Sequence, residues 1–251
     1  DAEWAAELAA KRDRLVADRI GRDGYLQEWI VDRPNMVKGQ RHTSHLIGVF
    51  PGTSISMTKT PDFAKAAMKS LELRGLGKDN RRSWTWPWRT ALWARFHQPA
   101  KAYSMVQHYI RYNVLDNLFG DHPPMQMDGT FGMPGGMSEM LIQSHAGVIE
   151  LLPAIPTAWS DGHVKGIRAR GNITVDIEWK DGEIINYKLD GDTSNINVYN
   201  KGNLTIVESE FYDNTVGANL IYNLGKSNNV PEDDEHFLKS NLKSSILPFG
   251  F

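Results

Sequence analysis

The sequence predicts a multidomain protein in which an all-α region precedes an all-β region. Apolar residues recur at helical spacing through residues 1–150, whereas short stretches after residue 150 alternate apolar and polar residues between Asp-Gly turns. A chain of 251 residues is long enough for one or two domains. We therefore expect a helical domain over 1–150, an antiparallel β-sandwich domain over 151–225 and an irregular tail over 226–251.

Two helices are expected early in the chain. Residues 1–15 are rich in alanine and in charged side chains, as a surface helix would be. Residues 60–75 carry terminal signals: Thr60 suits an N-cap, Pro61 the first helical position and Gly75 the end.

Residues 85–115 predict a pair of antiparallel helices. Apolar side chains recur at intervals of three to five residues on both sides of Pro99, and the proline marks the turn between the two helices. A further short helix is expected over 135–145.

The β region follows a linker that contains two prolines. Alternation and turn residues predict six clear strands, within a domain of about seven; they cover residues 163–171, 172–182, 183–191, 195–202, 204–211 and 219–225.

Composition excludes several classes of function. The formal net charge is −2 and the basic residues are scattered, which argues against binding to nucleic acid or to anionic lipid. There are no cysteines, so disulfides and thiolate metal sites are excluded. No apolar run approaches the roughly 18 residues that a membrane span requires. We expect no membrane span, no cofactor and no metal.

Three stretches carry more polar and aromatic detail than a core requires: 24–32, 39–52 and 122–132. In the second stretch, Arg41 and His42 offer a guanidinium fork and an imidazole to the hydroxyls of a polar ligand. The alternative is a pair that stabilises the loop, with His45 buried in the fold. His42 and His45 lie three residues apart, but no third ligand accompanies them, which argues against a metal.

Asp128 is the most specific candidate in the third stretch. It follows a pair of prolines and is flanked by Gly129 and Gly132, so we expect a stiff, irregular loop that holds one carboxylate against a substrate. The alternative is an Asx-turn, in which Asp128 bonds the backbone beyond Gly129. The local sequence leaves both readings open.

Two more groups of side chains have competing interpretations. Trp84 and Trp86 could stack on a sugar ring, although core packing is the commoner role of tryptophan. Glu28 is a second carboxylate near these loops, and we assign it to a structural hydrogen bond.

These stretches, in their order along the chain, resemble glycoside hydrolase family 95, a family of inverting α-L-fucosidases. The resemblance covers roughly residues 20–190 and runs through the segments LQEW, QRHTSHLIGVFPG, SLELRG, WPWRTALWARF, HPPMQMDGTFG, SEMLIQSHAGVIELLPAIPTAW and GHVKGIRARG. It implies hydrolysis of α-linked L-fucose, chiefly α-1,2, from a fucosylated oligosaccharide or glycan. It also implies an (α/α)6 barrel, of which residues 1–150 form the C-terminal part, followed by a smaller β domain.

The resemblance also implies roles for four residues. Asp128 corresponds to the general base, and Arg41, His42 and His122 correspond to residues around the sugar. The general acid and a pair of asparagines that orient the base are expected upstream of residue 1. We therefore expect the N-terminal part of the same enzyme to complete the barrel. The setting typical of the family is bacterial, secreted or periplasmic.

The sequence departs from the family pattern at a few positions. Thr130 stands where asparagine is common, and Arg81, Arg82 and Pro87 alter a segment near the sugar. A more polar pocket could favour L-galactose, which carries an additional hydroxyl. An α-L-galactosidase on the same scaffold and a non-catalytic carbohydrate-binding relative are therefore the alternatives.

Overall fold

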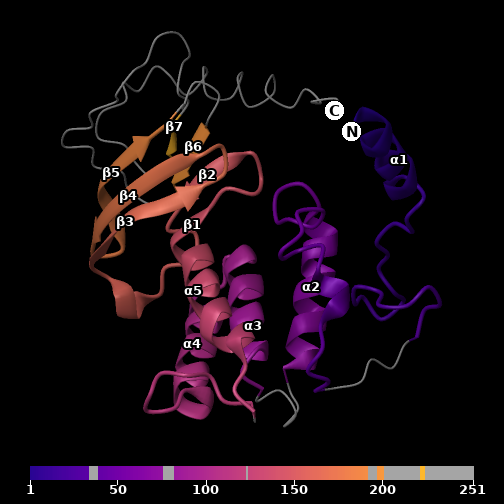
Figure 1. Ribbon diagram of the computed structural model, residues 1–251, viewed down its shortest axis with the longest axis horizontal. Helices are drawn as coiled ribbons and strands as arrows, with labels where there is room; N and C mark the ends of the chain where they lie inside the picture. The colour runs from indigo at the N-terminus through magenta and orange to yellow at the C-terminus, as the bar shows by residue number, and fades with distance from the viewer. Residues whose placement is uncertain (34–38, 76–81, 123, 192–196, 201–220, 224–251) are drawn as a thin grey trace.

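A computed structural model describes residues 1–33, 39–75, 82–122, 124–191, 197–200 and 221–223 of the chain (Figure 1). Helices come first and strands follow, as the sequence predicts. The α-helices are α1 (Ala2–Arg12), α2 (Pro61–Arg74), α3 (Thr85–Arg95), α4 (Pro99–Asn113) and α5 (Met127–Leu141). Short 3₁₀ helices cover Ser44–Leu46 and Thr157–Trp159.

Helix α2 has the predicted ends but not the predicted capping bond. Thr60 occupies the N-cap position and Pro61 opens the helix. The Thr60 hydroxyl accepts a hydrogen bond from the Ser56 backbone N–H at 2.9 Å, so it serves the preceding turn instead of the helix. Gly75 ends the helix in a right-handed conformation, with φ of −73°.

Helices α3 and α4 form the predicted antiparallel pair. Pro99 is the first residue of α4, where its missing N–H costs no intrahelical hydrogen bond. The turn before it requires a left-handed residue, and His97 supplies it with φ of 52°. In Figure 1, α3, α4 and α5 lie side by side, and α1 lies apart from them.

Helix α5 corrects two predictions. The helix expected over 135–145 begins at Met127 and ends at Leu141. Asp128 therefore lies in the first turn of a helix and not on an irregular loop. Pro134 is accommodated within the helix, in the turn after Gly129 and Gly132.

The glycines of α5 allow the helix to pack closely on Ser83 and α3. A Cβ atom on Gly129 would lie 1.8 Å from the Ser83 hydroxyl oxygen, and one on Gly136 would lie 2.9 Å from the Pro87 carbonyl oxygen. Gly132 likewise approaches the Pro87 ring. Spaced by three and four residues, these glycines form one helix face that packs closely on α3. They serve contact between helices, whereas the sequence suggested turns.

The strands form two small sheets. They are β1 (Ile142–Gln143), β2 (Val148–Leu151), β3 (Gly162–Ala169), β4 (Ile173–Lys180), β5 (Glu183–Asp190), β6 (Asn197–Asn200) and β7 (Ile221–Asn223). One sheet has the order β3-β4-β5 and is antiparallel throughout, as predicted. The other has the order β1-β2-β6-β7, and its β2-β6 and β6-β7 pairs are parallel, which the sequence did not predict.

Both sheets contribute to one hydrophobic core. Ile149 and Leu151 of β2 belong to the same buried cluster as Val175 and Ile177 of β4. A parallel pair such as β2-β6 requires a long connection, and β3, β4 and β5 lie within it. The predicted strand over 204–211 and the tail over 226–251 lie outside the described residues.

A second core unites the helices. Ala64 and Leu71 of α2 pack in one cluster with Leu92 of α3 and Val106 of α4. Among the residues that the structure describes, no helix is both long and apolar enough to cross a bilayer.

Candidate active site

The predicted site residues gather near one end of the helices. This end comprises the C-termini of α2 and α4 and the N-termini of α3 and α5, which lie at the bottom of Figure 1. Hydrogen bonds join the elements there: Arg89 of α3 donates to the Arg74 carbonyl of α2 at 3.1 Å. Trp86 Nε1 donates to Asn113 Oδ1 of α4 at 2.7 Å.

His42 is exposed, and its imidazole packs on a tryptophan. The ring centroids of His42 and Trp84 lie 5.0 Å apart at an interplanar angle of 39°. The His42 backbone is held from both sides, because its N–H donates to Gln40 Oε1 at 2.9 Å and its carbonyl accepts from Arg74 Nη1 at 2.8 Å. Arg41, the preceding residue, is half-buried. The loop thus presents a fixed imidazole beside an aromatic ring.

A buried polar layer lies beneath this loop. The Arg74 guanidinium is paired with the Glu28 carboxylate, and His45 Nδ1 lies 3.9 Å from the other oxygen of that carboxylate. Burial lowers the pKa of His45 to about 4; the Glu28 charge opposes this effect and the Arg74 charge adds to it. His45 is therefore neutral near pH 7. Glu28 has the structural role that the sequence suggested. The His45 side chain is buried, as expected if this loop is stabilised from within the fold.

Asp128 is exposed in the first turn of α5. A carboxylate there is favoured by the partial positive charge of the helix N-terminus. The adjacent Gly129 is buried against Ser83, so the position of Asp128 is set by the contact between α5 and the segment that precedes α3. A packed helix terminus supplies the rigidity that the sequence assigned to a proline-rich loop.

His122 is half-buried in the segment between α4 and α5. This segment is tied to both helices. Asn113 and Asp121 exchange two hydrogen bonds of 2.7 Å, one from the Asn113 side-chain amide and one from the Asp121 N–H. The Gly120 N–H donates to Thr130 Oγ1 at 3.0 Å. Thr130, one of the departures from the family pattern, therefore anchors the His122 segment to α5.

The short segment of Ser83 and Trp84 connects the two halves of the site. Ser83 contacts Gly129, next to Asp128, while Trp84 contacts His42. Two consecutive residues thus connect His42 to the residue that follows Asp128. Chemically, this end offers a carboxylate that can accept a proton and an imidazole that can bind hydroxyls.

Sequence reasoning missed two contributors. Ser83 was not singled out, and no local signal marks it. Arg74 was not singled out either, although it continues the buried face of α2 after Ala67 and Leu71 at helical spacing. A charged residue at an apolar position was the available signal. The sugar-stacking reading of Trp86 is wrong, because its side chain is only 6% exposed and belongs to the core.

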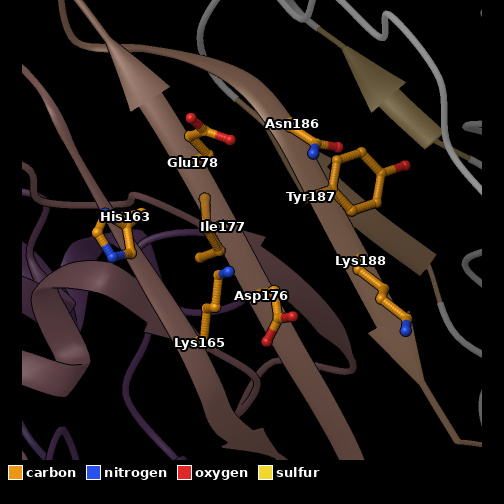
Figure 2. A pocket seen from close by; sticks show the side chains of 8 residues that line it. All are labelled: His163, Lys165, Asp176, Ile177, Glu178, Asn186, Tyr187 and Lys188. Atoms are coloured by element: carbon orange, nitrogen blue, oxygen red, sulfur yellow. The ribbon is translucent and has the colours of Figure 1, made fainter.

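A hollow of about 320 Å³ lies elsewhere, on the outer face of the β3-β4-β5 sheet (Figure 2). His163, Glu178 and Asn186 stand opposite one another across the three strands. Their alternation with buried residues is that of a solvent-facing sheet. None of the predicted site residues lines this hollow.

Among the described residues, no group of three or more His, Cys, Asp or Glu side chains is arranged to hold a metal ion.

Comparison with known proteins agrees with the order of helices and strands. Residues 1–141 match the model of the glycosyl hydrolase family 95 catalytic domain, and residues 143–223 match the family 95 C-terminal domain. The chain is 38% identical over 197 residues to Alpha-L-fucosidase 2 of Arabidopsis thaliana, covering 73% of this chain and 23% of that protein.

Two fungal relatives are similar to the chain over a comparable length. Probable alpha-fucosidase A of Aspergillus niger is 34% identical over 183 residues, covering 66% of this chain and 23% of that protein. The protein of the same name from Aspergillus oryzae is 32% identical over 207 residues, covering 72% of this chain and 29% of that protein. The chain thus spans about a quarter of the length of these relatives. Since the catalytic-domain model alone matches more than half of its residues, the chain belongs to glycoside hydrolase family 95.

Proposed function

We propose that this chain is the C-terminal portion of an α-L-fucosidase that releases α-linked L-fucose, chiefly from α-1,2 linkages, with inversion. Asp128 is the general base, and Arg41, His42 and His122 bind the sugar. The observation that carries the proposal is the placement of Asp128. It is an exposed carboxylate on the first turn of α5, and Ser83 and Trp84 link that turn to the His42 loop.

The chemistry follows from the demands of inversion. One carboxylic acid protonates the leaving oxygen while a second carboxylate, on the opposite face of the ring, deprotonates the attacking water. The base must be held in place, because a displacement of about 1 Å can reduce the rate about a hundredfold. Close packing of Gly129 on Ser83 supplies that constraint for Asp128. The general acid is expected in the N-terminal part of the complete enzyme.

The proposal extends to architecture and setting. Helices α2 to α5 are part of an (α/α)6 barrel that the N-terminal part of the enzyme completes, and the two sheets form a β-sandwich. Exposed apolar side chains on the helices support this, since they include Ile110 of α4 and Phe131 of α5. A secreted or periplasmic location in a bacterium is proposed from the family resemblance.

An α-L-galactosidase is the second candidate. Thr130 supports it, because this residue departs from the family pattern two positions after Asp128. L-galactose and L-fucose differ by one hydroxyl. A site that binds that hydroxyl would discriminate strongly against the sugar lacking it.

The test compares the complete enzyme with its Asp128→Asn variant on 2′-fucosyllactose. The matched control is Asp116→Asn, which makes the same change at another exposed carboxylate near the end of α4. We expect the wild type to release β-L-fucose first, as seen by NMR. Asp128→Asn should lose at least about a thousandfold in rate, within the range for a general base, and Asp116→Asn should keep wild-type activity.

The outcomes separate the alternatives. Full activity of Asp128→Asn would contradict the assigned base. A wild type that cleaves an aryl α-L-galactoside but not the fucoside would replace the substrate and keep the scaffold. A complete enzyme that binds either sugar but cleaves neither would favour the non-catalytic relative.

A further inference from the structure

Arg74 has an unusual location for a guanidinium. Its side chain is only 2% exposed, at the last residue of α2, beneath the His42 loop. Burial of a charge is unfavourable unless a counter-charge and hydrogen bonds compensate for it. Glu28 supplies the counter-charge, and its carboxylate accepts from Arg74 Nη2.

The guanidinium also reaches the candidate sugar site. Arg74 Nη1 donates at 2.8 Å to the carbonyl of His42, the residue whose ring packs on Trp84. One planar group therefore joins a carboxylate on one segment to the backbone of another. The rigid fork of an arginine suits this bridging role, and a lysine ammonium does not reproduce it.

Glu28 is itself held in place. The segment that precedes it is fixed to α2, because the Leu26 N–H lies within hydrogen-bond distance of both Ser70 Oγ, at 3.0 Å, and the Ala66 carbonyl, at 3.3 Å. The neutral His45 side chain lies on the other side of the carboxylate. Hydrogen bonds between buried or half-buried groups thus connect α2 through Arg74 to Glu28 and to the His42 carbonyl.

We infer that Glu28 and Arg74 are positioning residues for sugar binding: their ion pair fixes the His42 backbone and so holds the imidazole against Trp84 before the sugar arrives. The inference rests on the proposed function, in which His42 contacts the sugar. A buried ion pair often adds little net stability compared with apolar side chains of similar size. Its contribution here is the placement of the His42 carbonyl.

The test is a double variant of the complete enzyme, Glu28→Leu with Arg74→Met. Removing both charges leaves no unpaired buried ion, so the protein should stay folded with a melting temperature near that of the wild type. The dissociation constant of L-fucose, measured by calorimetry, should rise at least about tenfold, and kcat/KM on 2′-fucosyllactose should fall about a hundredfold. Unchanged sugar affinity in the folded double variant would overturn the inference.

A second ion pair on α3 provides the matched control. Arg95, at the other end of α3, is paired with Glu139, and its side chain is also 2% exposed. The double change Arg95→Met with Glu139→Leu should leave the L-fucose affinity within about twofold, because Arg95 bonds the carbonyls of Val49 and Gly52, seven and ten residues beyond His42, and not the His42 carbonyl. An equal loss of affinity in both double variants would point to a general structural effect and would overturn the inference.

Two further measurements cover the remaining cases. Arg74→Lys keeps the positive charge but loses the planar two-nitrogen geometry of the guanidinium, so the variant should fold and show an intermediate loss of L-fucose affinity. Wild-type affinity in this variant would count against the inference.

The imidazole resonances of His42, assigned with a His42→Gln variant, should carry a ring-current shift from Trp84 that the Glu28/Arg74 double variant loses. This shift requires no sugar. Its loss would support the positioning role even if the wild type bound no L-fucose, a result that would contradict the proposed function alone.

Discussion

Gly129 approaches Ser83 so closely that a Cβ atom on the glycine would lie 1.8 Å from the serine hydroxyl oxygen. No real Cβ atom occupies such a position. Even with the hydroxyl turned away, the Ser83 Cβ and carbonyl carbon would lie at 3.0 and 3.2 Å, so a larger residue at 129 requires some separation of α5 from the segment that precedes α3. Because Asp128 is the adjacent residue, the separation would also displace the candidate base.

The first prediction concerns this contact. Gly129→Ala should destabilise the protein by about 1–3 kcal/mol through overpacking and reduce fucosidase activity more than stability alone explains. Gly135→Ala is the matched control in the same helix, since nothing lies within 4 Å of a Cβ atom there. That change should stabilise the protein by up to about 1 kcal/mol. Melting temperatures and rates of both variants check the prediction; equal behaviour of the two would refute it.

The second prediction concerns the ring that supports His42. Trp84→Ala removes the contact at 5.0 Å and should weaken L-fucose binding about threefold to tenfold, the equivalent of a typical aromatic pair. Trp84→Phe keeps a ring face and should retain most of the affinity. Calorimetric titration of both variants provides the measurement. If the Trp84→Ala and Trp84→Phe variants bind L-fucose equally well, the aromatic ring at position 84 does not contribute to sugar binding.

The third prediction concerns stability at low pH. The pKa of His45 is lowered to about 4 in the folded protein, so the folded state holds fewer protons than the unfolded state below about pH 6.5. The contribution of the neutral His45 to the free energy of unfolding is therefore fully present above pH 6.5 and is lost as the pH falls toward 4. The part due to His45 should amount to about 2 kcal/mol between pH 7 and pH 5.

The measurement is the melting temperature at pH 7 and pH 5. His45→Leu should lose less stability than the wild type over this interval, because leucine cannot take up a proton. His163→Leu, at an exposed position on β3, serves as the control and should behave like the wild type. An unchanged pH dependence in His45→Leu would show that the imidazole is not buried in its neutral form.

The fourth prediction concerns the shared core of the two sheets. Ile177 is 2% exposed in the cluster that also contains Ile149 of the other sheet. Ile177→Ala should cost about 2–4 kcal/mol through the lost contacts and the cavity it leaves. Glu178→Ala, on the opposite face of β4, should change stability by less than about 0.5 kcal/mol. Denaturant unfolding of both variants provides the test, and a small effect at Ile177 would argue against a common core.

Local sequence patterns predicted the regular elements well and the irregular ones poorly. Pro61 and Pro99 mark the starts of α2 and α4 because a proline at the first turn interrupts no helical hydrogen bond. The same kind of reasoning failed for residues 127–132, where Gly129 and Gly132, after a pair of prolines, argued for a loop. Their effect depends on α3, which allows the glycines to pack closely, and a local window cannot contain that partner.

The candidate site shows the same division. The types of its residues, a carboxylate, two histidines and an arginine, were readable from the sequence, and the family resemblance gave them roles. The contacts of Arg74 were not readable, since its partners Glu28 and His42 lie 46 and 32 residues away. The parallel pairing of β2 with β6 was likewise hidden, because the strands' own alternation does not specify their neighbours.

By itself, the sequence determined the succession of helices and strands and the family to which the chain belongs, because periodicity and motifs are local properties. Only the tertiary structure decided that Asp128 begins a packed helix, that Ser83 and Trp84 join it to His42, and that a buried ion pair lies beneath the loop. Those features arise from contacts between distant segments. Their energies depend on distance and burial, which no linear pattern records.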